Sequence, residues 1–108
     1  MHQHDVFFSL KDRSPRGRND LADGCRTYLG GHPGTIFFTC GTVAEELDRP
    51  VNDRDFDVSL HIVFKDRASH DLYQTAPRHR AFIELFEAKW SRVRVFDSIV
   101  EGGAERVS

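Results

Sequence analysis

The sequence predicts an α+β fold of the ferredoxin-like type, in which one antiparallel four-stranded sheet carries helices on a single face. With 108 residues, the chain has room for one domain. Segments rich in phenylalanine and β-branched residues alternate with amphipathic helical patterns in the order β-α-β-β-α-β. Helices on one face leave the other face of the sheet uncovered, so we expect a second copy of the chain to cover it in a homodimer.

The first part of this pattern is a strand, a helix and a second strand. Residues 4–10 (HDVFFSL) are rich in Phe and Val, which predicts a strand. Ser14 and Pro15 predict a helix start, because Ser caps free amides and Pro loses no hydrogen bond at the first helical position. The helix is expected to end at Leu29, before a Gly-Gly pair. Residues 35–43 (TIFFTCGTV) predict the second strand.

The third strand is predicted over residues 56–64 (FDVSLHIVF), where apolar side chains alternate with others. One set is expected to pack under the helices: Val58, Leu60, Ile62 and Phe64. The other set is expected to face the partner subunit: Asp57, Ser59, His61 and Val63. Residues 92–100 (RVRVFDSIV) predict the fourth strand, which closes a domain of residues 3–100, and residues 101–108 form a polar tail that frays.

A proline interrupts the second helical region, which spans residues 66–90. Its apolar stripe is expected to consist of Phe82, Leu85, Phe86 and Lys89 or Trp90. Pro77 cannot donate a backbone hydrogen bond, and it disfavours helical angles at the residue before it. We therefore expect a short helix near residues 66–74, a break at 75–76 and a longer helix that starts at Pro77.

This break concerns function as well as fold, because it opens a small notch between the two helices. Tyr73 lies on the last turn of the first helix, and His79 lies in the first turn of the second. Both polar tips are expected to converge above the apolar face of the sheet. The alternative interpretation is that both are core residues whose polar groups are satisfied within the protein.

Composition excludes several classes of function. With a net charge of −2 and a pI near 6.3, the chain has no overall positive electrostatic field to attract nucleic acid or an anionic membrane. The basic segment at residues 11–18 is interpreted as a solvated loop and helix start. No apolar run approaches the roughly 18–20 residues of a membrane span, and the start lacks the features of a signal peptide. Cys25 and Cys40 lack metal-site spacing and indicate a reducing compartment, so the protein is expected to be cytoplasmic.

The order and the residue patterns of these segments resemble the stress-responsive dimeric α/β-barrel (Dabb) family, which includes olivetolic acid cyclase-like proteins. The matching stretches are HDVFFSLKD, HPGTIFFTCG, FDVSLHIVFKD, LYQTAPRHRAF and KWSRVRVFD, which together cover residues 3–100. The resemblance implies a homodimer in which two four-stranded sheets pack face to face as a barrel. It also implies a pocket between sheet and helices in each subunit.

Site residues follow from the cyclase-like branch only as implications of the resemblance. The implied catalytic residues are His79, Tyr73 and His4. The implied apolar lining for a substrate is Val6, Phe8, Leu21, Cys25 and Leu60. The chain departs from the pattern at Ala76, where many members carry a histidine, and Leu21 and Cys25 replace bulkier aromatic residues of the cyclase. The polyketide substrate therefore does not carry over.

No metal and no cofactor are predicted. His2 and His4 project to the same side of a strand and are a candidate pair of metal ligands. Two imidazoles on a fraying terminus make a poor site without carboxylate or thiolate support. The stretch YLGGHPG follows a helix rather than opening one, so it is no phosphate loop, and nothing specifies haem or flavin.

Two classes of function remain open from the sequence. The first is a binding or stress-protective protein that holds a small apolar or aromatic molecule without catalysis. The second is a cofactor-free enzyme of the proton-transfer type, such as a polyketide cyclase or an isomerase. In the second case His79 acts as general base, Tyr73 donates a hydrogen bond to an enolate or carbonyl oxygen, and His4 supports the pair.

Overall fold

A computed structural model describes residues 1–102 of the chain and has the predicted order of elements. The elements are β1 (His2–Leu10), α1 (Pro15–Leu29), β2 (Thr35–Thr42), β3 (Val58–Phe64), α2 (Arg67–Thr75), α3 (Pro77–Phe86), the 3-10 helix η1 (Glu87–Lys89) and β4 (Trp90–Ile99). The strands form one antiparallel sheet in the order β2-β3-β1-β4, which is the ferredoxin-like arrangement. Residues 103–108, most of the predicted tail, lie outside the described residues.

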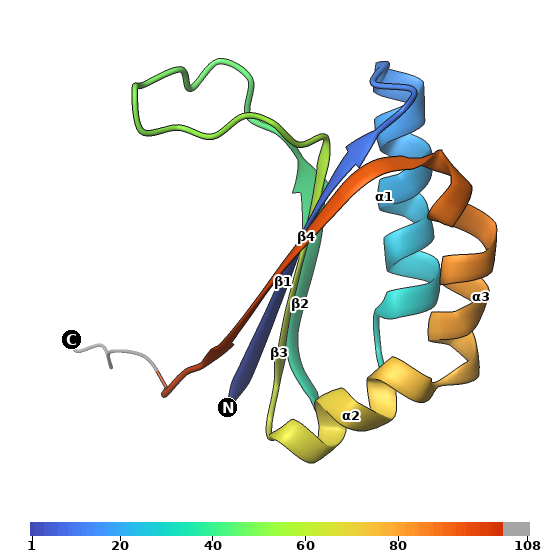
Figure 1. Ribbon diagram of the computed structural model, residues 1–108. Coiled ribbons are helices and arrows are strands. Elements are labelled where there is room, and N and C mark those ends of the chain that lie inside the picture. The colour runs from blue at the N-terminus through green and yellow to red at the C-terminus, as the bar shows by residue number, and fades with distance from the viewer. Residues whose placement is uncertain (103–108) are drawn as a thin grey trace.

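The sheet and the helices form two layers. Figure 1 shows the sheet nearly edge-on, with α1, α2 and α3 on one side and the long β2–β3 connection extending past the other. The core lies between the layers, and its apolar side chains come from β1, β3 and the helices. The prediction of helices on a single face is therefore confirmed. No helix within residues 1–102 is long and apolar enough to cross a membrane.

The alternation of β3 is confirmed for the face under the helices. The four residues predicted to pack there are all buried: Val58, Leu60, Ile62 and Phe64. Ser59, His61 and Val63 lie on the opposite face and are half-buried, and their contact with a partner stays a prediction. The prediction for Asp57 is wrong, because this side chain is 0% exposed within the chain itself. Since β3 starts at Val58, the strand alternation does not extend to Asp57.

Asp57 is held by the segment that we interpreted as a solvated basic loop. Its carboxylate accepts hydrogen bonds from the Leu10 amide (2.8 Å), Arg13 Nε (2.9 Å) and Arg18 Nε (3.0 Å). A buried carboxylate is tolerated only when charges and donors compensate it, and these three groups do so. The basic segment is therefore in part structural, because two of its arginines fix the start of β3.

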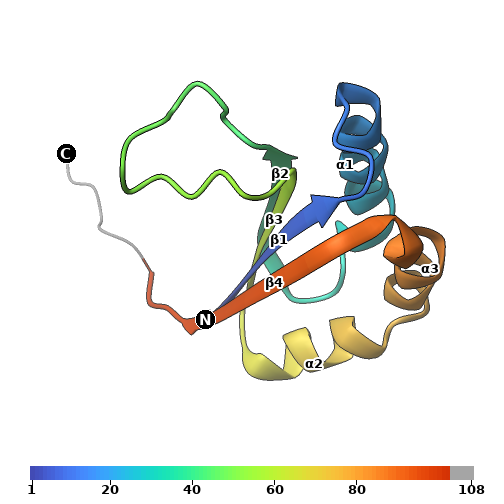
Figure 2. The same ribbon diagram turned by 45° about the horizontal axis from the view of Figure 1, so that its top comes forward.

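The predicted helix break is confirmed. Thr75 ends α2, and Ala76 has an extended conformation with φ −66° and ψ 144°. Pro77 then occupies the first turn of α3, and Figure 2 shows α2 and α3 as separate helices with different directions. The geometry follows from proline, which disfavours helical angles at the residue before it and needs no hydrogen-bond acceptor.

The stripe predicted for the second helix is partly wrong. Phe82 is buried and Phe86 packs against the core, as predicted, but Leu85 is 53% exposed and Ile83 faces the core in its place. With 3.6 residues per turn, residues 82, 83 and 86 share one side of the helix and residue 85 falls outside it. Trp90 belongs to β4 rather than to the helix, because η1 ends the helical segment at Lys89.

A glycine substitution tests how β2 and α2 fit together. Gly34 has a φ of +84°, and a Cβ built on it would lie 2.1 Å from Ser69 Oγ. Gly34→Ala is expected to lower the free energy of unfolding by about 1–3 kcal/mol, because it adds a strained backbone conformation and a contact with α2. Urea denaturation measures this change. Gly41→Ala is the matched control, since its Cβ would meet open space at an ordinary φ, and an equal loss in both variants would contradict the explanation.

Candidate functional site

A cavity of about 300 Å³ lies between the inner face of the sheet and the helices α2 and α3. Apolar side chains from β1, β3, α1, α3 and β4 form most of its wall, and the implied lining residues Val6, Phe8 and Leu60 are among them. Val93 and Val95 also line it, yet they are 37% and 51% exposed. The cavity therefore opens to solvent beside β4.

The polar residues of the wall gather from β1, the two helices at the break, and β4: His4, Tyr73, Gln74, His79 and Asp97. The rings of Tyr73 and His79 meet edge to face, with centroids 4.8 Å apart. The ring of His4 also lies near Tyr73, at a centroid distance of 5.8 Å. The structure thus brings together the three residues that the resemblance implied. The break at Pro77 is the local cause, because it turns the first residues of α3 back toward the end of α2.

Burial sets the protonation of this pair. It raises the pKa of the Tyr73 hydroxyl well above its usual range, so Tyr73 is a hydrogen-bond donor at neutral pH. It also lowers the pKa of His79, and the nearby His4 and His32 add to that effect. His79 is therefore neutral at pH 7 and has one ring nitrogen that accepts a proton or a hydrogen bond.

A cluster of three histidines and one carboxylate adjoins the polar end of the cavity. Asp97 Oδ1 lies 2.7 Å from His4 Nδ1 and 2.9 Å from His2 Nε2. The third histidine is His70 of α2, and its Nε2 lies 3.9 Å from the same Asp97 oxygen. The rings of His2 and His70 are stacked, with centroids 4.3 Å apart and an interplanar angle of 17°. His4 and Asp97 thus belong both to this cluster and to the cavity wall.

Within this cluster, His70 is neutral and Asp97 is ionised at pH 7. Burial lowers the pKa of His70 to about 4, and the neighbouring His4 and His2 act in the same direction. Burial alone would raise the pKa of Asp97, but hydrogen bonds to His4 and His2 outweigh it and leave that pKa below its ordinary value.

Sequence reasoning missed His70 and Asp97. The spacing of His2 and His4 indicated that they share a side of β1, and the structure confirms this placement. Asp97 joins them because it lies directly opposite His4 in the β1–β4 pairing, and this register cannot be read from either strand alone. His70 reaches the cluster only because α2 is packed over that end of the sheet.

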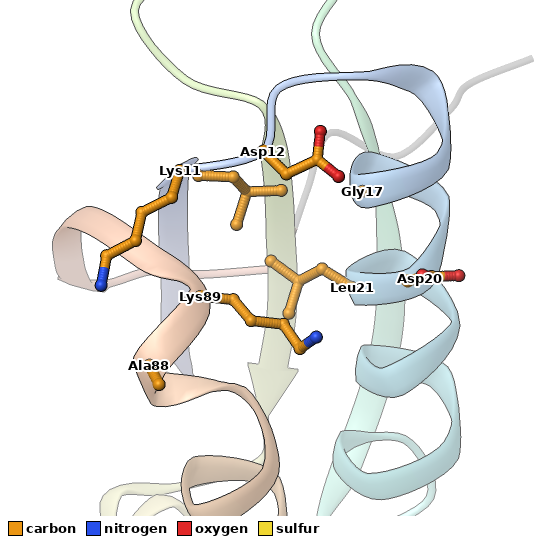
Figure 3. A pocket seen from close by; sticks show the side chains of 8 residues that line it. Lys11, Asp12, Gly17, Asp20, Leu21, Ala88 and Lys89 are labelled. Carbon is orange, nitrogen blue, oxygen red and sulfur yellow. The ribbon is translucent and has the colours of Figure 1, made fainter.

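Two implied lining residues lie elsewhere. Leu21 lines a second cavity of about 250 Å³ between the start of α1 and η1, together with Lys11, Asp12 and Lys89 (Figure 3). Cys25 is fully buried in the core, and burial raises the pKa of its thiol. Neither residue is in the wall of the 300 Å³ cavity. Cys25 and Cys40 are both free thiols.

Fold and site together define a class of protein: a ferredoxin-like α+β chain with a ligand-sized cavity between its sheet and its single layer of helices. The family model of the stress responsive A/B barrel domain, Dabb, matches residues 3–100 of the chain. The chain therefore belongs to the Dabb family, as the resemblance of its segments indicated.

Solved structures confirm the fold. A Dabb family protein with a ferredoxin-like fold from Mesorhizobium loti is 20% identical, with a TM-score of 0.75 over 94% of this chain and 97% of the other. The hydroxynitrile lyase of Passiflora edulis is 19% identical, with a TM-score of 0.73 over 96% of each chain. A dimeric ferredoxin-like protein of unknown function from Thermobifida fusca is 14% identical, with a TM-score of 0.73 over 92% of this chain and 90% of the other. No curated protein matches this sequence.

Proposed function

We propose that the protein binds a small, largely apolar molecule in the 300 Å³ cavity and holds a polar group of that molecule at Tyr73 and His79. One observation carries this proposal: an apolar cavity that is open to solvent has a donor and an acceptor side by side at one end. Mostly apolar walls with a few convergent polar groups are typical of ligand sites. A binding or stress-protective role of this kind needs no cofactor.

We further propose that two chains form a homodimer through the outer face of the sheet. Aromatic side chains gather on that face, where Phe7 contacts both Phe56 and Phe96. Phe37 and Phe96 are more than half exposed in the single chain. Aromatic residues exposed on one face of a sheet are typical of a surface that another protein covers. The dimeric state of the Thermobifida fusca protein supports a homodimer.

We also propose a cellular role and a compartment for the protein. Membership of the stress responsive domain family supports a role in stress protection, and the two free thiols support a reducing compartment such as the cytoplasm.

The second candidate is a cofactor-free enzyme for proton transfer, and the contact between Tyr73 and His79 favours it. The neutral imidazole of His79 would accept a proton from the substrate. The Tyr73 hydroxyl would donate a hydrogen bond to the oxygen on which negative charge develops, and His4 would support the ring of Tyr73. Because the fold is similar to that of a hydroxynitrile lyase, substrates of proton-transfer reactions are included in the ligand screen.

A thermal-shift screen of small aromatic and polyketide-like compounds tests the binding proposal. We expect compounds that raise the melting temperature of the wild-type protein. Tyr73→Phe and His79→Gln are each expected to weaken binding about 3- to 10-fold, the effect of one lost hydrogen bond. His61→Gln is the control, because His61 lies on the opposite face of the sheet. Ligands that bind both cavity variants as tightly as the wild type would contradict the proposed site.

Turnover of any compound found in this way separates the two candidates. In the enzyme, His79→Gln is expected to lower kcat by about 100- to 10,000-fold, because a general base is lost. Product formation followed by NMR measures this rate. A compound that binds at Tyr73 and His79 but is recovered unchanged supports the binding role, and turnover that survives His79→Gln would exclude His79 as the base.

A further inference from the structure

The cluster of three imidazoles and one carboxylate has the composition of a site for a first-row divalent metal ion. Its members come from β1, α2 and β4: His2, His4, His70 and Asp97. One ligand atom from each lies within 4.8 Å of all the others. We infer that this cluster binds a divalent transition metal ion, with Zn²⁺ as the ion that three imidazoles and one carboxylate fit best.

Three of the six distances within the cluster can be compared with those of a tetrahedral site. Bonds of about 2.0–2.1 Å from a central Zn²⁺ place its ligand atoms about 3.3–3.4 Å apart. The three ring nitrogens lie 2.7, 2.9 and 3.9 Å from Asp97 Oδ1, so they fall on both sides of that value. The four atoms lie within 4.8 Å of one another, and the stacked rings of His2 and His70 would have to rotate for all four to meet one ion.

His70 contributes a buried imidazole to the cluster from α2. Its ring is nine-tenths buried, and Nδ1 has no hydrogen-bond partner within the described residues. Nε2 faces the cluster, where Gln74 Nε2 lies 3.0 Å from it. Coordination through Nε2 would place the proton of the neutral ring on Nδ1. Binding also requires that the long side chain of Gln74 turn away, which the open cavity beside it allows.

The backbone around the cluster is fixed, which removes the objection that the sequence raised. His2 is paired on both sides, with Phe64 of β3 and with Ile99 of β4. The terminal amino group of Met1 donates to the Val100 carbonyl (3.0 Å), and the Val100 amide donates back to the Met1 carbonyl (2.9 Å). The first histidines therefore do not lie on a fraying end, and Asp97 supplies the carboxylate that the pair lacked.

Four protein ligands make a closed site, as in structural zinc centres. The ion would join β1 and β4 to α2. This inference does not rest on the proposed function, because neither Tyr73 nor His79 belongs to the ligand set, although His4 and Asp97 also line the cavity.

Metal titration of the chain without a polyhistidine tag tests the inference. After dialysis against a chelator, the protein is titrated with Co²⁺, and Zn²⁺ is then added. We expect one Co²⁺ per chain with the visible absorption of a tetrahedral ion, and loss of that absorption as Zn²⁺ displaces it. Isothermal titration gives the Zn²⁺ affinity, and Zn²⁺ is expected to raise the melting temperature while Mg²⁺ does not.

Variants place the ion at the cluster. Asp97→Asn and His70→Gln are each expected to weaken Zn²⁺ binding by more than about 10-fold. His61→Gln, which removes a histidine paired with Asp5 on the opposite face, is expected to leave affinity unchanged. Circular dichroism confirms that each variant is folded. Should a cluster variant fail to fold, the stoichiometry and spectrum of the wild type decide. The inference is overturned if the wild type shows no saturable binding at micromolar Zn²⁺, or if His61→Gln weakens binding as much as His70→Gln does.

Discussion

Replacing Asp57 by alanine is expected to lower the free energy of unfolding by about 3–5 kcal/mol. The substitution leaves the Leu10 amide and the two arginine side chains without the buried carboxylate that accepts their hydrogen bonds. Arg18 is the more affected arginine, because its side chain is only 17% exposed. A loss of this size is a large fraction of the stability of a domain with about 100 residues.

Urea denaturation followed by circular dichroism measures the effect of Asp57→Ala. Asp55→Ala is the matched control, since Asp55 also pairs with Arg13 but lies at the surface. Its removal is expected to cost no more than about 1 kcal/mol. A similar small loss of unfolding free energy in both variants would contradict this. It would mean that water hydrates the arginines of residues 11–18 as well as Asp57 binds them, as the interpretation of a solvated loop assumed.

Replacing Phe96 by aspartate is expected to weaken the proposed homodimer by at least about 1000-fold. Phe96 lies on the outer face of β4 and contacts Phe7, the side chain around which the aromatic group on that face is arranged. In a symmetric dimer each substitution occurs twice, so two carboxylates are buried without partners. A cost of about 2 kcal/mol for each gives roughly a 1000-fold change in the dissociation constant.

Analytical ultracentrifugation over a range of concentrations measures the oligomeric state of this variant. Leu85→Asp is the control, because Leu85 is exposed to nearly the same degree but lies on α3, in the other layer. We expect Leu85→Asp to remain dimeric while Phe96→Asp sediments as a folded monomer. Dissociation by Leu85→Asp alone would place the interface on the helices and contradict the face-to-face arrangement of sheets.

Local sterics made parts of this structure predictable from the sequence. The break before Pro77 follows from the covalent geometry of one residue, and the buried face of β3 follows from strict alternation. Contacts between distant segments were harder to predict. Asp97 meets His4 through the register of two strands far apart in the chain, and Asp57 was misplaced because β3 begins one residue after it. The candidate pair Tyr73 and His79 came from the break together with the family resemblance.

His4 and Asp97 lie in the wall of the cavity and also in the histidine cluster. Occupation of either place therefore changes the surroundings of the other, and thermodynamic linkage requires the effect to be mutual. If a bound metal ion raises the affinity of the protein for a small molecule by some factor, that molecule raises the affinity for the ion by the same factor.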